Sequence, residues 1–350
     1  MEEAIKRLAN WASKKPQAPE AIQIYPTNKC NLRCTFCSQQ LQEYNLADTV
    51  KKRRWFAITK ELCKLGVKKI LISGGGEPLC EPKLTFGIMK IAKRYGLTGR
   101  IINNGTLWTE KLVNKAIKIG WDNVIFSIDG SNPATHDFLR GKREAFNRII
   151  ENIKLFNKFK DRPSLEFTTV LNIYNYKEIP EIIKLASDLK IKSITVEPVC
   201  VNNPNVEKIK LNQKQRKLFQ EKIIPESQKL ATSLNINTNF PKFSELKFEK
   251  TGELRNSILK NTSNNFFNMP CYEPWIWPKI EANGEVWPCS TVPIRSENIK
   301  NKTFKEIWYG SEFNKFRERI MNHDLPEGCE NCVSTHLPIN QEIREKLKEY

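Results

Sequence analysis

The feature that most constrains this chain is a loop with three closely spaced cysteines, Cys30-Asn-Leu-Arg-Cys34-Thr-Phe-Cys37. Thiolate sulfur is the ligand that iron–sulfur clusters prefer, and this spacing lets one loop wrap around a small cluster. Three thiolates leave one iron of a four-iron cluster without a protein ligand, so a cofactor or substrate can coordinate that iron. Four thiolates would instead complete a structural zinc site.

Two other interpretations of these cysteines stay open. They could form a zinc knuckle completed by a distant ligand, or be a chance grouping among the ten cysteines of the chain. Most of the ten lie in tight or cluster-like spacings, which is typical of metal binding in a reducing compartment rather than of a disulfide scaffold. We interpret Cys63 and Cys80 as core or incidental residues.

The composition is that of a globular protein, with 39% apolar and 27% charged residues. No apolar run approaches the length that spans a bilayer, and the acidic N-terminus lacks the apolar segment of a secretory signal. We therefore expect a cytoplasmic protein without a membrane partner.

The chain is strongly basic, with 57 Lys and Arg against 39 Asp and Glu and a formal charge of +18. A field of this sign favours anionic partners such as nucleic acid, phosphorylated small molecules or acidic proteins. The lysines are spread along the whole chain and the densest run, 51–54, is short, which disfavours nucleic-acid binding. An acidic electron donor such as a flavodoxin or ferredoxin would gain from the same charge.

Strand-like and helix-like segments alternate through the first 200 residues. Such alternation predicts an α/β fold with a parallel sheet and right-handed crossovers, in which the loops after the strands carry the site. The expected strands are 21–25, 69–73, 99–103, 123–128, 165–171 and 193–197, and the expected helices are 51–66, 82–95, 109–119, 143–158 and 177–189.

The cysteine loop, with Phe36 directly before its last cysteine, resembles the signature of the radical S-adenosylmethionine (radical SAM) enzymes. Six strands that begin at this loop resemble that family's partial (β/α)6, TIM-like barrel. The resemblance implies a [4Fe-4S] cluster held by Cys30, Cys34 and Cys37. In the family, the open iron binds S-adenosylmethionine (AdoMet), and electron transfer to the sulfonium releases a 5′-deoxyadenosyl radical.

Two further motifs follow expected strands. Gly74-Gly75-Gly76-Glu77-Pro78 resembles the family's Gly-Gly-Glu-Pro element, which implies that Gly75, Gly76 and Glu77 bind the methionyl amino group. Asn103-Asn104-Gly105-Thr106 is similar to the family's Thr-Asn-Gly, which makes Asn104 a cofactor contact. Glycine and asparagine are also ordinary turn residues, so both motifs keep a purely structural interpretation.

The next expected strand ends in Ser127-Ile-Asp129-Gly, followed by His136-Asp-Phe-Leu-Arg140-Gly. This resembles a pattern of the peptide- and carbohydrate-modifying branch of the family. It implies that Ser127 and Asp129 lie near the ribose and that Arg140 lies near the methionyl carboxylate. We expect His136 in a surface turn and assign it no catalytic role.

Cys200 follows the sixth expected strand, at a position that faces the substrate in family members. A thiol there could donate a hydrogen atom to a substrate radical, as in radical epimerases. The alternative is a small buried hydrophobe.

A second cysteine pattern lies near the C-terminus, at Cys271, Cys289, Cys329 and Cys332. With the segment 297–317 it is similar to SPASM-type extensions, which implies one auxiliary [4Fe-4S] cluster. No cysteine follows Cys332, so the pattern matches the shorter, twitch-like version. A zinc ribbon is the alternative, because zinc also accepts four thiolates. Asn283-Gly284 predicts a hairpin turn within this part.

These patterns together predict an N-terminal helix (1–20), the barrel (21–200), a helical bridge (201–268), the SPASM/twitch-like extension (269–335) and a C-terminal helix (336–350). We expect oxidation of a carbohydrate or aminocyclitol alcohol, with the auxiliary cluster as electron acceptor. The short segment before the cysteine loop leaves no room for a leader-peptide domain, which favours a small substrate. The alternatives are a peptide maturase that crosslinks or epimerises residues, and a non-catalytic zinc or iron–sulfur protein that binds nucleic acid.

Overall fold

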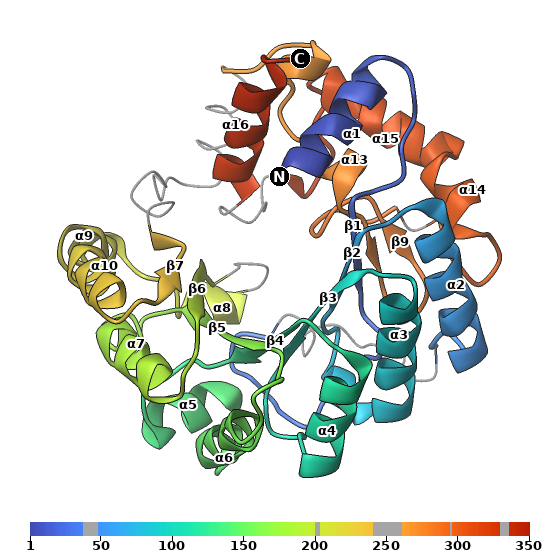
Figure 1. The fold of residues 1–350 in the computed structure, drawn as a ribbon. Helices are drawn as coiled ribbons and strands as arrows, with labels where there is room; N and C mark the ends of the chain where they lie inside the picture. The colour runs from blue at the N-terminus through green and yellow to red at the C-terminus, as the bar shows by residue number, and fades with distance from the viewer. Residues whose placement is uncertain (38–47, 200–203, 241–260, 295, 330–335) are drawn as a thin grey trace.

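A single sheet organises the computed structural model, which describes residues 1–37, 48–199, 204–240, 261–294, 296–329 and 336–350. Its strand order is β7-β6-β5-β4-β3-β2-β1-β8-β9. All neighbours are parallel except β8 and β9, and the two ends of the sheet do not pair with each other (Figure 1). The strands are β1 Ala21–Ile24, β2 Lys69–Ile72, β3 Thr98–Asn103, β4 Asn123–Ser127, β5 Ser164–Leu171, β6 Ser193–Pro198, β7 Asn237–Thr238, β8 Lys279–Ile280 and β9 Val286–Trp287.

The six strands expected from the sequence are confirmed to within one residue at each end. Their side chains explain why: β5 alternates strictly between buried and partly exposed positions, whereas β4 is buried along most of its length. Continuous burial is typical of a strand in the middle of a parallel sheet, with packed layers on both faces.

The helices between these strands lie along the outside of the curved sheet (Figure 1). They bury an extensive apolar core against it, which includes Trp55, Phe86, Phe156 and Ile182. The five expected helices are present, and α5 is an additional helix that the sequence analysis did not predict. The bounds are α2 Lys52–Leu65, α3 Pro82–Arg94, α4 Glu110–Ile119, α5 Pro133–Arg140, α6 Ala145–Asn157 and α7 Ile179–Asp188, with a short 3-10 helix η2 at Pro78–Cys80.

A second core joins the two ends of the chain. Helix α1 (Glu2–Ala12) packs against α13 (Glu273–Ile276) and α16 (His336–Leu347), and Ile5 and Leu8 are buried there beside Trp275 and Leu347. The partly buried Cys271, Cys289 and Cys329 pack against this same core. The N-terminal helix therefore stabilises the part of the molecule that carries the second cysteine pattern.

The remaining elements complete the two ends of the sheet. On one side, α10 (Ile224–Ser233) packs against β7 and α7. On the other, β8 and β9 form the antiparallel hairpin expected at Asn283-Gly284, and β8 pairs in parallel with β1. Among the described residues, no helix has both the length and the apolar character needed to cross a bilayer. The remaining bounds are α8 Pro204–Glu207, α9 Gln213–Leu218, η3 Phe219–Ile223, α10 Ile224–Ser233, η4 Phe266–Asn268, α14 Phe304–Trp308 and α15 Ser311–Met321.

Candidate functional site

The three cysteines of the first motif follow the carboxyl end of β1, and all three are partly buried. Two of their sulfur atoms have N–H donors directed at them. The backbone N–H of Leu32 lies 3.5 Å from Cys30 Sγ, and Arg140 Nη1 lies 3.7 Å from Cys34 Sγ. Burial raises the pKa of Cys30, and it raises the pKa of Cys34 to about 11. These N–H groups provide the hydrogen bonds that a metal-bound thiolate accepts.

The C-terminus of α5 holds the cysteine loop in place. The backbone N–H of Thr35 donates to the carbonyl of Leu139 at 2.9 Å, and that of Arg33 donates to the carbonyl of Arg140 at 3.2 Å. Gly141 ends the helix with a φ of +62°, and a Cβ at this position would lie 2.0 Å from the carbonyl oxygen of Arg33. Only glycine fits here, because the loop backbone passes directly over it.

The glycine-rich loop after β2 holds the other end of the cysteine loop. The N–H of Gly76 donates to the carbonyl of Thr27, and the N–H of Glu77 donates to the carbonyl of Lys29, both at 2.8 Å. A Cβ on Gly76 would lie 2.1 Å from the carbonyl oxygen of Lys29. Gly75, between the strand-side and helix-side parts of this loop in sequence, is buried. The two loops that the sequence linked to the cofactor are therefore in direct backbone contact.

The buried carboxylate of Glu77 connects this loop to the loop after β3. Its Oε1 accepts the N–H of Leu79 at 2.9 Å, and its Oε2 accepts the N–H of Asn104 at 2.7 Å. Burial raises the pKa of Glu77 to about 7, although these two N–H donors act in the opposite direction. Because both oxygens are engaged by the backbone, the side chain of Glu77 fixes the relative position of the two loops.

Asn104 continues the network back to the cysteine loop. Its Nδ2 donates to Asn31 Oδ1 at 2.9 Å, and Asn31 Nδ2 donates to Thr106 Oγ1 at 2.8 Å. Sequence analysis missed Asn31 and Thr106 in this role. Both residues lie within recognised motifs, and this was the only sign of their role in the sequence. The contact joins residues 75 positions apart, which the spacing within a motif does not reveal.

Ser127 ends β4 and Asp129 follows two residues later, in the loop where both were expected, and Arg140 lies beside Asp129. The carboxylate of Asp129 is fully buried and forms an ion pair with the guanidinium of Arg140, whose Cζ lies 5.4 Å from the ring of Phe36. The expectation for His136 was wrong. It belongs to α5, is completely buried, and its Nδ1 accepts the N–H of Asp129 at 3.2 Å, so it packs behind the site rather than in a surface turn.

The second group of cysteines shows the same kind of environment. The N–H of Val292 lies 3.2 Å from Cys289 Sγ, and Asn340 Nδ2 lies 3.9 Å from Cys271 Sγ. Burial raises the pKa of Cys289 to about 12, and the nearby Glu273 and Cys329 add to this rise. Cys332, expected as the fourth ligand, and Cys200, the candidate hydrogen donor, lie outside the described residues.

The donor sets fit iron–sulfur clusters in three respects. They consist of thiols, N–H groups are directed at several sulfur atoms, and the loops that present them are fixed by backbone hydrogen bonds. Within the described ranges, no three His, Cys, Asp or Glu side chains converge on one metal ion. A cluster of four irons is larger than one ion, so its ligand sulfurs must stand farther apart.

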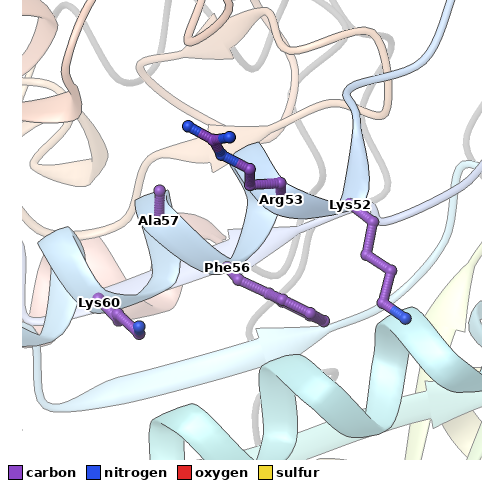
Figure 2. A pocket seen from close by; sticks show the side chains of 5 residues that line it. All are labelled: Lys52, Arg53, Phe56, Ala57 and Lys60. Carbon is purple, nitrogen blue, oxygen red and sulfur yellow. The ribbon is translucent and has the colours of Figure 1, made fainter.

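A separate pocket of about 480 Å³ is lined by side chains of α2 (Figure 2). The ring of Phe56 forms its apolar part and packs against Gly87 of α3. Three basic side chains of the same helix line the pocket, and Lys52 Nζ lies 5.5 Å from the centroid of the Phe56 ring. None of the expected cluster or AdoMet residues is among the lining residues. The lining residues are Lys52, Arg53, Phe56, Ala57 and Lys60.

Two family models match the chain at the places where these sites lie. The radical SAM superfamily model matches residues 24–186, and the model of SPASM, an iron–sulfur cluster-binding domain, matches residues 271–333. The chain belongs to the radical SAM superfamily. Its C-terminal part is a SPASM domain, so the protein is a SPASM-type radical SAM enzyme with AdoMet, a [4Fe-4S] cluster and an auxiliary iron–sulfur cluster as cofactors.

Relatives with assigned activities extend along most of the chain. An AdoMet-dependent heme synthase of Methanosarcina barkeri is 27% identical over 86% of this chain and 85% of its own length. A PqqA peptide cyclase of Rhizobium meliloti is 24% identical over 95% of this chain and 84% of its own length. Streptococcus suis SuiB, bound to its precursor peptide SuiA, shares the fold with a TM-score of 0.66 at 18% identity, covering 91% of this chain and 71% of SuiB.

Proposed function

We propose that this enzyme modifies a peptide, either by forming a crosslink or by epimerising residues. The observation that carries this proposal is the similarity to three PqqA peptide cyclases, which are 24–25% identical over 90–95% of this chain. It favours the peptide alternative over the oxidation of a carbohydrate or aminocyclitol alcohol, which the sequence analysis placed first. The shared fold with peptide-bound SuiB supports the same choice.

In this proposal Cys30, Cys34 and Cys37 bind the first [4Fe-4S] cluster. When bound, the cluster and AdoMet together supply reductive sulfonium cleavage and a radical that abstracts a substrate hydrogen. The residues around them orient AdoMet, because a radical of this kind must form against one substrate hydrogen and away from other donors. These residues are Phe36 beside the last cysteine, Gly75, Gly76 and Glu77 at the methionyl amino group, Asn104, Ser127 and Asp129 toward the ribose, and Arg140 at the carboxylate.

Cys271, Cys289, Cys329 and Cys332 bind the auxiliary cluster in this proposal. Crosslinking removes two hydrogen atoms from the peptide, so one electron must leave the substrate radical, and the auxiliary cluster is the proposed acceptor. Epimerisation instead needs a hydrogen atom returned to the opposite face of the carbon. Cys200 is the proposed donor for that reaction.

The proposed reductant is an acidic flavodoxin or ferredoxin, and the charge of +18 supports it. We propose that it docks at the pocket of α2, which Lys52, Arg53 and Lys60 line together with Phe56. The test is the double variant Lys52→Glu/Lys60→Glu, compared with Lys111→Glu/Lys160→Glu, which makes the same change of charge on exposed residues elsewhere. The first variant should raise KM for flavodoxin several-fold and leave the rate with dithionite unchanged. Equal effects of the two variants would contradict docking at α2.

The peptide proposal is tested by co-expression with short open reading frames that neighbour the gene, followed by mass spectrometry of the peptide. A crosslink appears as the loss of two hydrogen atoms, and an epimer appears as one deuterium taken up in heavy water. The Cys34→Ala variant is the control and should give neither. If the purified enzyme forms 5′-deoxyadenosine but leaves every candidate peptide unchanged, a peptide is not its substrate.

A second candidate substrate is a heme precursor, because the heme synthase of Methanosarcina barkeri is 27% identical over 86% of this chain. Incubation of the purified enzyme with AdoMet, reductant and a heme precursor under anaerobic conditions tests this candidate. Growth of the heme absorption spectrum together with 5′-deoxyadenosine would favour this candidate, and an unchanged spectrum would exclude it.

A further inference from the structure

The guanidinium of Arg140 lies between a buried acid and a cysteine of the first cluster motif. Arg140 is the last residue of α5, and only 8% of its side chain is exposed. One terminal nitrogen, Nη2, forms the ion pair with Asp129. The other, Nη1, donates to Cys34 Sγ at 3.7 Å, within the range of hydrogen bonds to sulfur. The two ends of one planar group thus contact different partners.

Asp129 is held rigidly on its other side. Its Oδ1 accepts the N–H of Val170 at 2.7 Å, its own N–H donates to His136 Nδ1 at 3.2 Å, and its carbonyl accepts Asn175 Nδ2 at 3.0 Å. Asp129, His136 and Asn175 are all completely buried. An exposed ion pair leaves an arginine free to move, whereas this buried one fixes the direction in which Nη1 points.

The ring of Phe36 limits the guanidinium further, since Arg140 Cζ lies 5.4 Å from the ring centroid. Arg140 Nε is buried and has no hydrogen-bond partner among the described residues. The contacts with Asp129 and Cys34 therefore use Nη2 and Nη1, and they do not compete for the same donor.

We propose that Arg140 sets the reduction potential of the cluster bound by Cys30, Cys34 and Cys37 through its N–H···S hydrogen bond to Cys34, with Asp129 as the residue that positions it. Reduction increases the negative charge on the sulfur atoms. A hydrogen-bond donor and a buried positive charge at Cys34 therefore stabilise the reduced form more than the oxidised form. The carboxylate of Asp129 offsets part of that positive charge. The hydrogen bond to Cys34 is therefore the main way in which Arg140 stabilises the reduced cluster. The inference rests on the proposed cluster assignment.

The test is a redox titration of the anaerobically purified holoenzyme without AdoMet, followed by electron paramagnetic resonance. The signal of this cluster is the one that AdoMet changes in a parallel sample. Arg140→Gln is compared with Arg33→Gln, which also removes one positive charge. Arg33 is a suitable control because its Nη1 donates to the backbone carbonyls of Cys30 and Leu32, so its charge lies in the same loop. The midpoint potential should become more negative in Arg140→Gln, by more than in Arg33→Gln.

Arg140→Lys keeps the positive charge, but a lysine has one terminal nitrogen and cannot contact Asp129 and Cys34 as the two ends of a planar guanidinium do. The midpoint potential of this variant should therefore also fall, by a smaller amount than in Arg140→Gln. If Arg140→Gln loses its iron, the midpoint potential of Arg140→Lys is the test. A potential more negative than that of the wild type supports the proposal, and an unchanged potential overturns it. Equal potentials in Arg140→Gln and Arg33→Gln overturn it too, even if AdoMet binds more weakly. Modification of a peptide by the wild type tests the proposed function separately, so that function can stand or fail whatever the outcome for Arg140.

Discussion

The backbone N–H of Tyr25 donates a hydrogen bond of 2.8 Å to the carbonyl of Ile280, which joins two strands that lie more than 250 residues apart. Tyr25 directly follows β1, and the cysteine loop begins a few residues later. Ile280 ends β8, the first strand of the SPASM hairpin. The auxiliary-cluster domain is therefore attached to the barrel through the same strand that presents the first cluster motif.

The hairpin turn at Gly284 should be essential for this attachment. Gly284 has a φ of +90°, and a Cβ there would lie 2.5 Å from Asn298 Oδ1 and 2.8 Å from a methyl carbon of Val50. Gly284→Ala should lower the free energy of unfolding by more than the roughly 1–2 kcal/mol expected for positive φ alone. Gly96→Ala is the matched control, because Gly96 has a φ of +78° and open space around it. Urea unfolding measures both, and equal losses would contradict a packing role for Gly284.

The alternating pattern of the chain was sufficient to predict β1 to β6 and five helices, because each segment buries one face against the same sheet. Helix α5 was missed although Asn132, Pro133 and Gly141 are ordinary signals for its start and end. Its residues match a family motif, and they were interpreted as cofactor contacts instead of as a helical segment. The pairing of β8 with β1 could not be predicted, because local sequence does not encode the partner of a short strand. The domain boundaries near 200 and 269 stay a prediction.

Cys329 should be required for the auxiliary cluster but not for the first one. Its neighbours Cys271 and Cys289 belong to a core that is separate from the cysteine loop after β1. The Cys329→Ala variant should lose about half of roughly eight irons per chain, and should still form 5′-deoxyadenosine from AdoMet without modified product. Iron analysis and product mass spectrometry measure these effects. Cys63→Ala is the control, and normal product from Cys329→Ala would remove the auxiliary cluster from the reaction.

The motifs selected several residues that the structure brings into contact, but they did not predict which atoms of these residues interact. Glu77 was expected to bind the methionyl amino group, and the structure places its two carboxylate oxygens on backbone N–H groups of two different loops. The contact between Arg140 and Cys34 spans 106 residues and depends on how α5 packs over the loop. Such contacts follow from tertiary packing, which no spacing within a motif encodes.

Glu77 should make the stability of the enzyme depend on pH. Its pKa is raised to about 7 in the folded protein from an ordinary value of 4.5, so between these values the folded state binds more protons than the unfolded state. Stability should therefore be greatest at low pH and fall as pH rises toward 7, by an amount on the order of 3 kcal/mol at most. Urea unfolding at pH 5.5 and 8 should show a flatter dependence for Glu77→Gln than for the wild type. The exposed Glu349→Gln is the control, and parallel dependences in all three proteins would contradict ionisation at Glu77.

Gly141 should be required for assembly of the first cluster. Its φ is +62°, and a Cβ would lie 2.0 Å from the carbonyl of Arg33, between Cys30 and Cys34. Gly141→Ala must therefore displace either the end of α5 or the cysteine loop. Both displacements separate the N–H donors of the loop from the carbonyls of Leu139 and Arg140 that accept their hydrogen bonds. Gly120→Ala is a close control, because Gly120 ends α4 with a φ of +69° and has nothing within 4 Å of an added Cβ. Both variants should lose about 1–2 kcal/mol from the unfavourable φ, but only Gly141→Ala should also lose iron and 5′-deoxyadenosine formation. Full iron content in Gly141→Ala would mean that the loop tolerates this displacement and that α5 does not determine its conformation.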